Sequence, residues 1–291
     1  MKKRKISPIE SLDMILLMEI MAFIGPNQYR FVAGTNRNFH TAYVQVFPTN
    51  ETYIDATTVN RAKICFHEWG NVYPLLQYQL TASAANVGNL RALQYLRLQD
   101  CDWDESTTGY AASNGHFATL KWARDSNCPW DEGTCSCAAE SGHFHILQWS
   151  RKNGCPWDVR TCLFAARHGH LHILKWARKN GCPWDADTCA FAAMDGQFSV
   201  LKWARKNGCP WNEYTTLHAA DHGYLDILRW ARENGCPWDE TVCSSAAENG
   251  HLHILQWARE NGCSWDKATA SSRKWSFKCI TMGKRNWLPV G

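Results

Sequence analysis

Cysteine recurs in two columns that could supply metal ligands. The columns are Cys101, Cys128, Cys155, Cys182, Cys209, Cys236 and Cys263, and then Cys135, Cys162, Cys189 and Cys243. They create C-x6-C pairs, whereas zinc modules prefer C-x2–4-C. Thr216 and Ala270 replace the second cysteine in other units, so a thiol or zinc-binding array is only a minor alternative. Members of one column should lie about 8–10 Å apart, beyond the ~7 Å limit of a disulfide. We expect reduced, buried thiols and a cytoplasmic or nuclear location.

Histidines occur in three pairs separated by one residue, and these pairs do not indicate a metal site. The pairs are His143 with His145, His170 with His172, and His251 with His253. Residues i and i+2 of a helix point to different faces. The chain also has no nucleophile–base–orienter set and no glycine-rich phosphate loop. We therefore predict no catalytic residue, no metal, no cofactor and no enzyme activity.

An arginine column could bind phosphates, but an acidic column matches it. The arginines are Arg97, Arg124, Arg151, Arg178, Arg205, Arg232 and Arg259. The acids are Asp104, Asp131, Asp158, Asp185, Asp239 and Asp266, with Asn212 at the remaining position. Balanced columns leave no net field to attract an anion. We expect each arginine to pair with an aspartate and to stack on tryptophan.

These columns exist because the chain repeats every 27 residues. Tryptophan marks the period at positions 122, 149, 176, 203, 230 and 257. Seven units fit residues 80–268, and a fixed period of this length predicts a stacked array. In the unit 161–187, a first helix starts at Thr161 and stops at Gly169, and a second helix spans 171–179. Asp185 can cap or turn into the next unit. The fold class is therefore an all-α solenoid of helix pairs.

The unit resembles an ankyrin repeat. Gly169-His170-Leu171, Ile173-Leu174 and Gly181-Cys182 match the second half of that family's pattern, whereas the first half is weak. An ankyrin unit has about 33 residues, and the shortfall falls between Asp185 and Thr188. The family places its β-hairpin finger there. The resemblance therefore implies a protein-interaction array with little or no strand, in which a partner contacts the first helices and the short turns.

Bulk composition is that of a soluble protein. The chain has 291 residues, is 45% hydrophobic and carries a net charge of +4 from 31 basic and 27 acidic residues. This charge is too small to indicate nucleic-acid binding. The apolar run at 14–25 contains Glu19 and is too short to span a bilayer. We expect a monomer that binds neither nucleic acid nor membrane.

Residues 1–50 form either an F-box-like segment or a helical cap, and residues 51–79 a helical connector that Pro74 interrupts. The segment resembles an F-box through Pro8-x-Glu10-x-Leu12, Ile15-Leu16, a Gly-Pro break and Asn36-Arg37-x-Phe39. That resemblance implies docking to a Skp1-type adaptor, for which the candidate residues are Pro8, Leu12, Ile15, Leu16 and Ile20. The chain would then be a substrate adaptor of a ubiquitin ligase.

The tail at 269–291 departs from the repeat. Met282-Gly283 is encoded by ATG-GGN, which yields a tryptophan codon when read one nucleotide along, and residues 281–290 can then read QWARETGCPW. We hypothesise that the tail is a frame-shifted copy of the repeat without an evolved structure. Sequencing the transcript tests this, because an intact frame with no insertion or deletion would exclude an error in the gene model.

Positions that vary between units are the candidates for partner binding, because repeat binders keep scaffold positions and vary the contact positions. They are Arg160, Arg167, His168, Asp187, Met194, Asp195, Glu213, Tyr214, Asp221, His222, Glu240 and Glu248. This acidic, aromatic and histidine-bearing set suits a protein partner better than a nucleic acid. The sequence thus favours a non-catalytic interaction scaffold, with the ubiquitin-ligase adaptor as the alternative.

Overall fold

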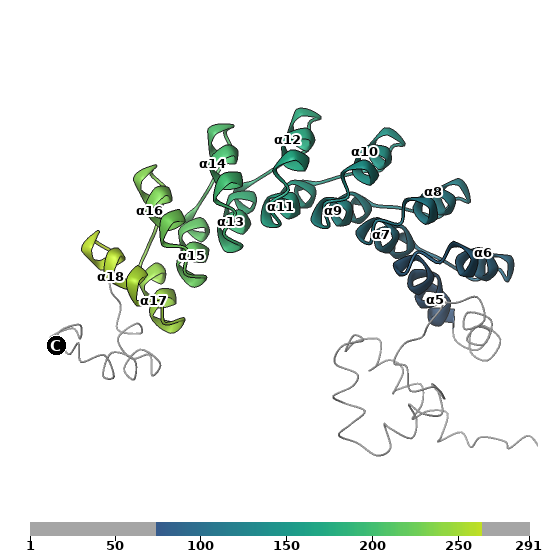
Figure 1. Ribbon diagram of the computed structural model, residues 1–291, viewed down its shortest axis with the longest axis horizontal. Helices are drawn as coiled ribbons and strands as arrows, with labels where there is room; N and C mark the ends of the chain where they lie inside the picture. The colour runs from purple at the N-terminus through teal and green to yellow at the C-terminus, as the bar shows by residue number, and fades with distance from the viewer. Residues whose placement is uncertain (1–73, 264–291) are drawn as a thin grey trace, which may run out of the picture. The chain divides into compact units, whose positions relative to one another are not determined.

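The computed structural model describes residues 74–263, and within this range it contains fourteen helices and no strand (Figure 1). The expected all-α fold is therefore confirmed. The F-box-like segment, most of the connector and the tail at 269–291 lie outside the described residues, as does Asp266.

The helices are short and regular. Their bounds are α5 Pro74–Asn86, α6 Leu90–Leu98, α7 Glu105–Ser113, α8 Phe117–Asp125, α9 Glu132–Glu140, α10 Phe144–Lys152, α11 Val159–Arg167, α12 Leu171–Lys179, α13 Ala186–Met194, α14 Phe198–Lys206, α15 Glu213–Asp221, α16 Leu225–Glu233, α17 Thr241–Glu248 and α18 Leu252–Glu260. Pro74 is the first residue of α5, a position that suits proline because the first helical turn leaves the N–H there unbonded anyway. The predicted interruption of the connector stays a prediction, because residues 51–73 lie outside the described residues.

The described residues belong to two compact units. The first contains residues 74–84 and 91–101, and the second contains residues 85–90 and 102–263. In the first unit, Arg97 donates a hydrogen bond to the carbonyl of Cys101, and the Cys101 thiol donates to the carbonyl of Gln77 at 3.4 Å. The second unit holds α7 to α18 and all the candidate binding residues.

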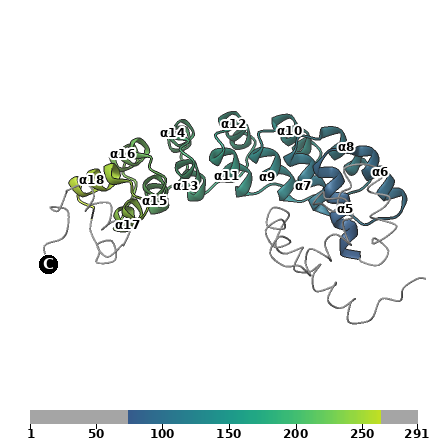
Figure 2. The ribbon, with the colours of Figure 1, turned by 60° about the horizontal axis from the view of Figure 1, so that its bottom comes forward.

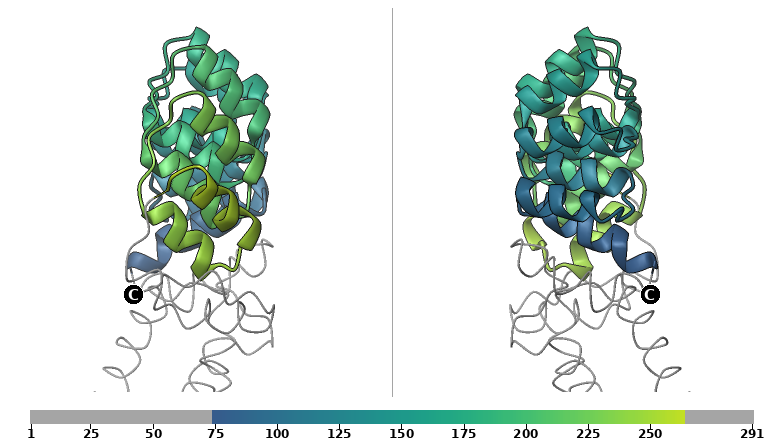
Figure 3. Two further views of the ribbon diagram at one scale, coloured as in Figure 1. Left: turned by 90° about the vertical axis from the view of Figure 1, so that its left-hand side faces the viewer. Right: turned by 90° about the vertical axis from the view of Figure 1, so that its right-hand side faces the viewer.

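In the second unit, the first helix of each pair lies in one row and the second helix in another (Figures 1 and 2). The row of first helices, α7, α9, α11, α13, α15 and α17, follows the inner side of the curve, and we call it the inner row (Figure 1). Views along the stack show successive pairs placed one behind another (Figure 3). Alanine pairs such as Ala165-Ala166 are fully buried on the inner row. Their small side chains let neighbouring helices approach closely.

The first helices α7 to α15 begin at the residue after the acidic column, whereas α17 begins two residues after Asp239. Asp158 accepts a hydrogen bond from the amide of Arg160 at 3.0 Å, and Asp185 accepts one from the amide of Asp187 at 3.2 Å. A side-chain oxygen at this position satisfies an amide that the helix leaves free. The predicted cap at Asp185 is confirmed, whereas the helix in its unit starts at Val159, not at Thr161. Asn212 precedes α15 without a side-chain cap bond.

A glycine of one 27-residue repeat contacts a histidine of the next repeat, and each of the two residues lies between the two helices of its own pair. Gly142 has φ +78°, and a Cβ atom there would lie 2.8 Å from Cε1 of His170 in the next unit. His170 Nε2 in turn lies 3.0 Å from the carbonyl of Glu140, the last residue of α9. The imidazole thus satisfies a carbonyl at a helix end. His116 and His251 repeat this contact, at 3.1 Å and 3.0 Å from the carbonyls of Asn86 and Asp221.

Tryptophan and arginine form a second contact between units. The guanidinium of Arg178 lies 4.0 Å from the ring centroid of Trp184, whose ring meets Trp203 of the next unit edge-on at 6.0 Å. Arg178 also donates to the carbonyl of Cys182. The predicted stacking on tryptophan is confirmed, but the predicted pairing with aspartate is wrong, because Asp185 caps α13 instead.

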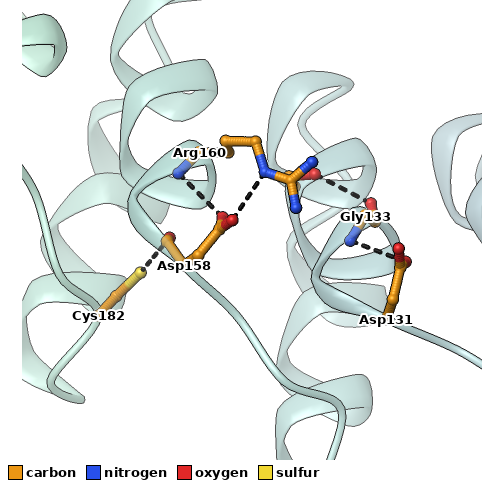
Figure 4. A network of polar contacts seen from close by, with 6 residues as sticks. Asp131, Gly133, Asp158, Arg160 and Cys182 are labelled. Carbon is orange, nitrogen blue, oxygen red and sulfur yellow. Dashed lines mark hydrogen bonds and ion pairs between the residues drawn. The ribbon is translucent and has the colours of Figure 1, made fainter.

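The thiols of the first cysteine column make the third contact. Cys182 Sγ donates to the carbonyl of Asp158, 24 residues earlier, at 3.4 Å (Figure 4). Cys155 and Cys209 do the same with Asp131 and Asp185, at 3.4 Å and 3.3 Å. The column therefore joins each unit to the cap of the unit before it.

Among residues 74–263, no helix has the length and apolar character that a membrane span requires.

We predict that alanine at Gly142 costs more stability than alanine at Gly181. Both glycines have a left-handed backbone, and a Cβ at Gly181 would meet nothing within 4 Å. Gly181→Ala should therefore lose only about 1 kcal/mol, the cost of that backbone for a residue with a Cβ. Gly142→Ala should lose about 1 kcal/mol more, because the His170 ring must leave its carbonyl partner. Urea unfolding followed by circular dichroism measures both losses, and equal values would contradict this contact between Gly142 and His170.

Candidate partner-binding surface

The inner row exposes one face of every first helix. Four positions recur on it, and helical spacing places them on one side. In α9 to α15 they are the second, sixth and ninth residues and the residue after the ninth. In α17, which has eight residues and begins one position later, they are the first, fifth and eighth residues and the residue after the eighth. We call this face of α9 to α17 the inner surface. Its residues are Gly133, Cys137, Glu140 and Ser141 on α9; Arg160, Phe164, Arg167 and His168 on α11; Asp187, Phe191, Met194 and Asp195 on α13; Tyr214, His218, Asp221 and His222 on α15; and Thr241, Ser245, Glu248 and Asn249 on α17. At each of these positions the residue is exposed or half-buried.

The residues predicted from variation between units all lie on the inner row. Ten of the twelve are on the inner surface itself, and the other two, Glu213 and Glu240, are exposed at the start of α15 and directly before α17. The prediction missed the middle position of the surface, which holds Cys137, Phe164, Phe191, His218 and Ser245. This position lies six residues after the capping column and also varies between repeats. Variation between repeats could therefore have identified it.

Contacts between units join these side chains into a continuous strip. His168 Nε2 lies 3.4 Å from a carboxylate oxygen of Glu140 on α9, the preceding helix of the inner row. Arg167 forms an ion pair with Asp195 of the next unit at 3.1 Å, and its guanidinium lies 5.6 Å from the ring centroid of Phe191. Each pair is partly exposed, so it contributes on the order of 1 kcal/mol or less to stability. Its larger effect is to fix side chains that a partner would meet.

The strip continues through α15 as a group of rings. The His218 ring lies 6.1 Å from Phe191 of the preceding unit, 6.3 Å from Tyr214 and 6.4 Å from His222. Burial and the neighbouring His222 lower the pKa of His218, so its imidazole is neutral near pH 7. Tyr214 remains 50% exposed and offers an accessible aromatic face. An exposed aromatic beside a polar group is typical of binding surfaces.

Arg160 lies at the amino-terminal edge of the surface and is held by the cap of its own helix. Its Nε is 2.7 Å from an oxygen of Asp158, the residue whose other oxygen caps α11 (Figure 4). This hydrogen bond raises the pKa of the Arg160 guanidinium. Arg160 and Arg167 are the only Lys or Arg residues on the first helices α7 to α17 and their caps.

Charge is therefore separated between the two rows, although it alternates along the sequence. The helices α13, α15 and α17, with their flanking caps, carry acids but no Lys or Arg. Among the second helices, α10, α12 and α14 carry Lys and Arg but no acid. The inner surface from α13 onward is thus acidic, and an acidic surface repels the phosphates of nucleic acids.

One cluster within residues 74–263 has the composition of a metal site. Ligand atoms of His218, Asp221 and His222 all lie within 4.8 Å of one another, and no other group of three His, Cys, Asp or Glu residues in this range does so. The repeating cysteine columns and histidine pairs of the sequence predicted no metal site, whereas this cluster occurs in one repeat alone. None of the repeating thiols among the described residues belongs to such a group.

The thiols lie in the core. Twelve cysteines are described, all of them free, and eleven are buried whereas Cys137 is half-buried. A neighbouring thiol and burial raise the pKa of Cys135, Cys162 and Cys189, and burial raises that of Cys236 to about 12. Burial also raises the pKa of Cys137. Since the thiolate is the reactive form, these cysteines are chemically quiet in the folded chain.

Comparison with known proteins finds one matching family and similar solved structures. Residues 135–178, which run from α9 to α12, match the family described as ankyrin repeats (many copies). The ankyrin repeat domain of human ASB11, known from a crystal structure, is similar at 16% identity and a TM-score of 0.47, over 61% of this chain and 96% of that chain. No curated protein matches. The family match thus supports the predicted ankyrin repeats over residues 135–178, and the F-box-like segment stays a prediction.

We predict that iodoacetamide modifies Cys137 before the other eleven described cysteines in the folded chain. Cys137 alone among them is partly accessible, and labelling should speed up as the pH rises, because its raised pKa keeps the thiol protonated at neutral pH. Peptide mapping by mass spectrometry measures the order. In urea all twelve should react at similar rates, and equally fast labelling of Cys155 or Cys182 in the folded chain would show that the core is open.

Proposed function

We propose that the array of ankyrin repeats is a non-catalytic protein-interaction module, and that its inner surface binds a basic segment of a partner protein. The observation that carries the proposal is the acidic strip of α13, α15 and α17, which contains accessible aromatic and histidine rings. Scaffold contacts between units are the same along the array, whereas the inner surface changes at every step. Such positions carry specificity in repeat proteins.

The short unit supports the same surface. Only six residues, 180–185, separate α12 from α13, and they form a turn without a strand. No projecting finger is therefore available between these helices for binding. A partner would then contact the first helices directly. Asp187 is exposed there on the inner surface, and Glu213 is exposed beside it at the start of α15.

Charge favours a basic partner, and the rings favour one with an apolar or aromatic side chain between the charges. Lysine and arginine gain from nearby carboxylates, and arginine also stacks on aromatic rings. Phe191 and Tyr214 lie on neighbouring helices of the strip, with the His218 ring in contact with both. A segment that carries one basic and one apolar residue for each unit it crosses would fit this pattern.

Display of random peptides against the full-length chain tests the proposal. Selected peptides should be rich in Lys and Arg, and the variant with Asp187→Lys and Glu213→Lys should bind them at least about tenfold more weakly, because two attractive charges become repulsive. The matched control reverses two charges on the second helices, Lys179→Glu and Lys206→Glu, and should bind like the unmodified chain.

Two outcomes would contradict the proposed surface. One is the selection of peptides that are neutral or acidic. The other is binding that the Lys179→Glu and Lys206→Glu control weakens while the inner-surface variant does not. Circular dichroism of both variants confirms that they remain helical.

The ubiquitin-ligase adaptor is the alternative, and it rests on the F-box-like pattern around Pro8, Leu12 and Ile15. We expect a Skp1-type adaptor to be captured by the full-length chain and not by a chain that lacks residues 1–50. Absence of capture by the full-length chain would remove the alternative. Either result leaves the interaction module in place, because peptide binding to the inner surface does not need residues 1–50.

A further inference from the structure

We propose that His218, Asp221 and His222 form a binding site for a zinc-type divalent cation at the carboxyl-terminal end of α15. The site lies on the inner surface, but its test measures metal binding alone and does not depend on peptide binding. Its three side chains are on one helical turn, and their ligand atoms lie within 4.8 Å of one another.

The spacing suits the chemistry. His218 and His222 are four residues apart, and residues i and i+4 of a helix share a face. Asp221 follows His218 by three residues and shares that face as well. Ligand atoms around a zinc ion at about 2.0–2.1 Å lie roughly 3.3–4.2 Å apart, so small side-chain rotations bring the three atoms to this distance. Two imidazoles and one carboxylate favour Zn²⁺ over Mg²⁺ or Ca²⁺.

The ligands are oriented by groups behind them. Asp221 Oδ1 accepts hydrogen bonds from Ser245 Oγ and Asn249 Nδ2 on the next unit, both at 2.7 Å. Asp221 Oδ2 lies 3.6 Å from His222 Nδ1. Asp221 Oδ1 is thus held by the neighbouring unit, and Oδ2, beside the His222 ring, is the oxygen left to bind an ion. Hydrogen-bonded partners of this kind fix a ligand's direction and strengthen metal binding.

The histidines are also fixed. His222 Nδ1 lies 3.1 Å from the carbonyl oxygen of His218. A carbonyl only accepts, so Nδ1 carries the proton and Nε2 keeps a free lone pair. The His218 ring is held between Phe191 and Tyr214. The carbonyls at the end of α15 add a partial negative charge that favours a cation.

The repeat supplies internal comparisons, because no other described unit has this set. The equivalent residues are Phe191, Met194 and Asp195 in the preceding unit, and Ser245, Glu248 and Asn249 in the following one. The scaffold at these positions therefore requires neither histidine nor aspartate. Three protein ligands leave coordination positions open for water or for a group from another molecule.

The test is titration of the full-length chain, freed of metal and kept reduced, with Zn²⁺ by calorimetry and with Co²⁺ by absorption. We expect one ion at this site, with a Co²⁺ spectrum that lacks the sulfur-to-cobalt charge-transfer band. His218→Phe and His222→Asn place residues that neighbouring units already hold, and Asp221→Asn keeps the oxygen that Ser245 contacts. Each should weaken binding by a factor of about ten or more.

His170→Gln is the matched control, because Gln197 occupies that position in the next unit, and it should bind the ion like the unmodified chain. Unchanged binding in His218→Phe, no binding by the unmodified chain, or a sulfur-to-cobalt band would each overturn the site. If a variant fails to fold, the unmodified chain still decides. Zn²⁺ should then protect His218 and His222, but not the exposed His172, from diethyl pyrocarbonate, and equal labelling of all three would overturn the site.

Discussion

The structure depends on the interlock by which each unit completes the unit before it. A pair of nine-residue helices such as α11 and α12 cannot bury its own apolar face, and stacking is what gives it a core. His170 hydrogen-bonds to the carbonyl of the last residue of α9, and its ring fits there because Gly142 has no Cβ. The Cys182 thiol donates a hydrogen bond to the carbonyl of Asp158, the residue that caps α11. Both bonds satisfy backbone groups that one unit cannot satisfy alone, so the helix ends are stable only within the stack.

This dependence explains which residues could be understood from the sequence. The 27-residue period, the helix ends at Gly169 and Gly181 and the cap at Asp185 are local features, and the structure has them where predicted. The predicted pairing of Arg178 with Asp185 was wrong, because the sequence pattern does not show that the Asp185 carboxylate already accepts a hydrogen bond from the start of its own helix. Asp185 uses its side chain to cap α13, and the guanidinium turns to Trp184 and a carbonyl.

Residues of the candidate surface show the same limit. Variation between units placed Arg167, Asp195 and Tyr214 correctly on the inner row, since only exposed positions are free to change. The ion pair between Arg167 and Asp195 joins residues 28 positions apart, and no pattern within one unit predicts it. The cluster of His218, Asp221 and His222 was missed for a related reason. These three residues occur together in one repeat alone, so the columns that recur along the sequence do not reveal them.

The separation of charge between the two rows has a consequence for how a partner arrives. Acidic inner helices and basic helices such as α12 and α14 give this part of the array a dipole moment across its width. A charged molecule at a distance feels a torque as well as an attraction, so it is turned before any side chain touches. A charged segment that approached the array would therefore be oriented by its field, and dissolved salt would weaken this effect over a Debye length of about 8–10 Å.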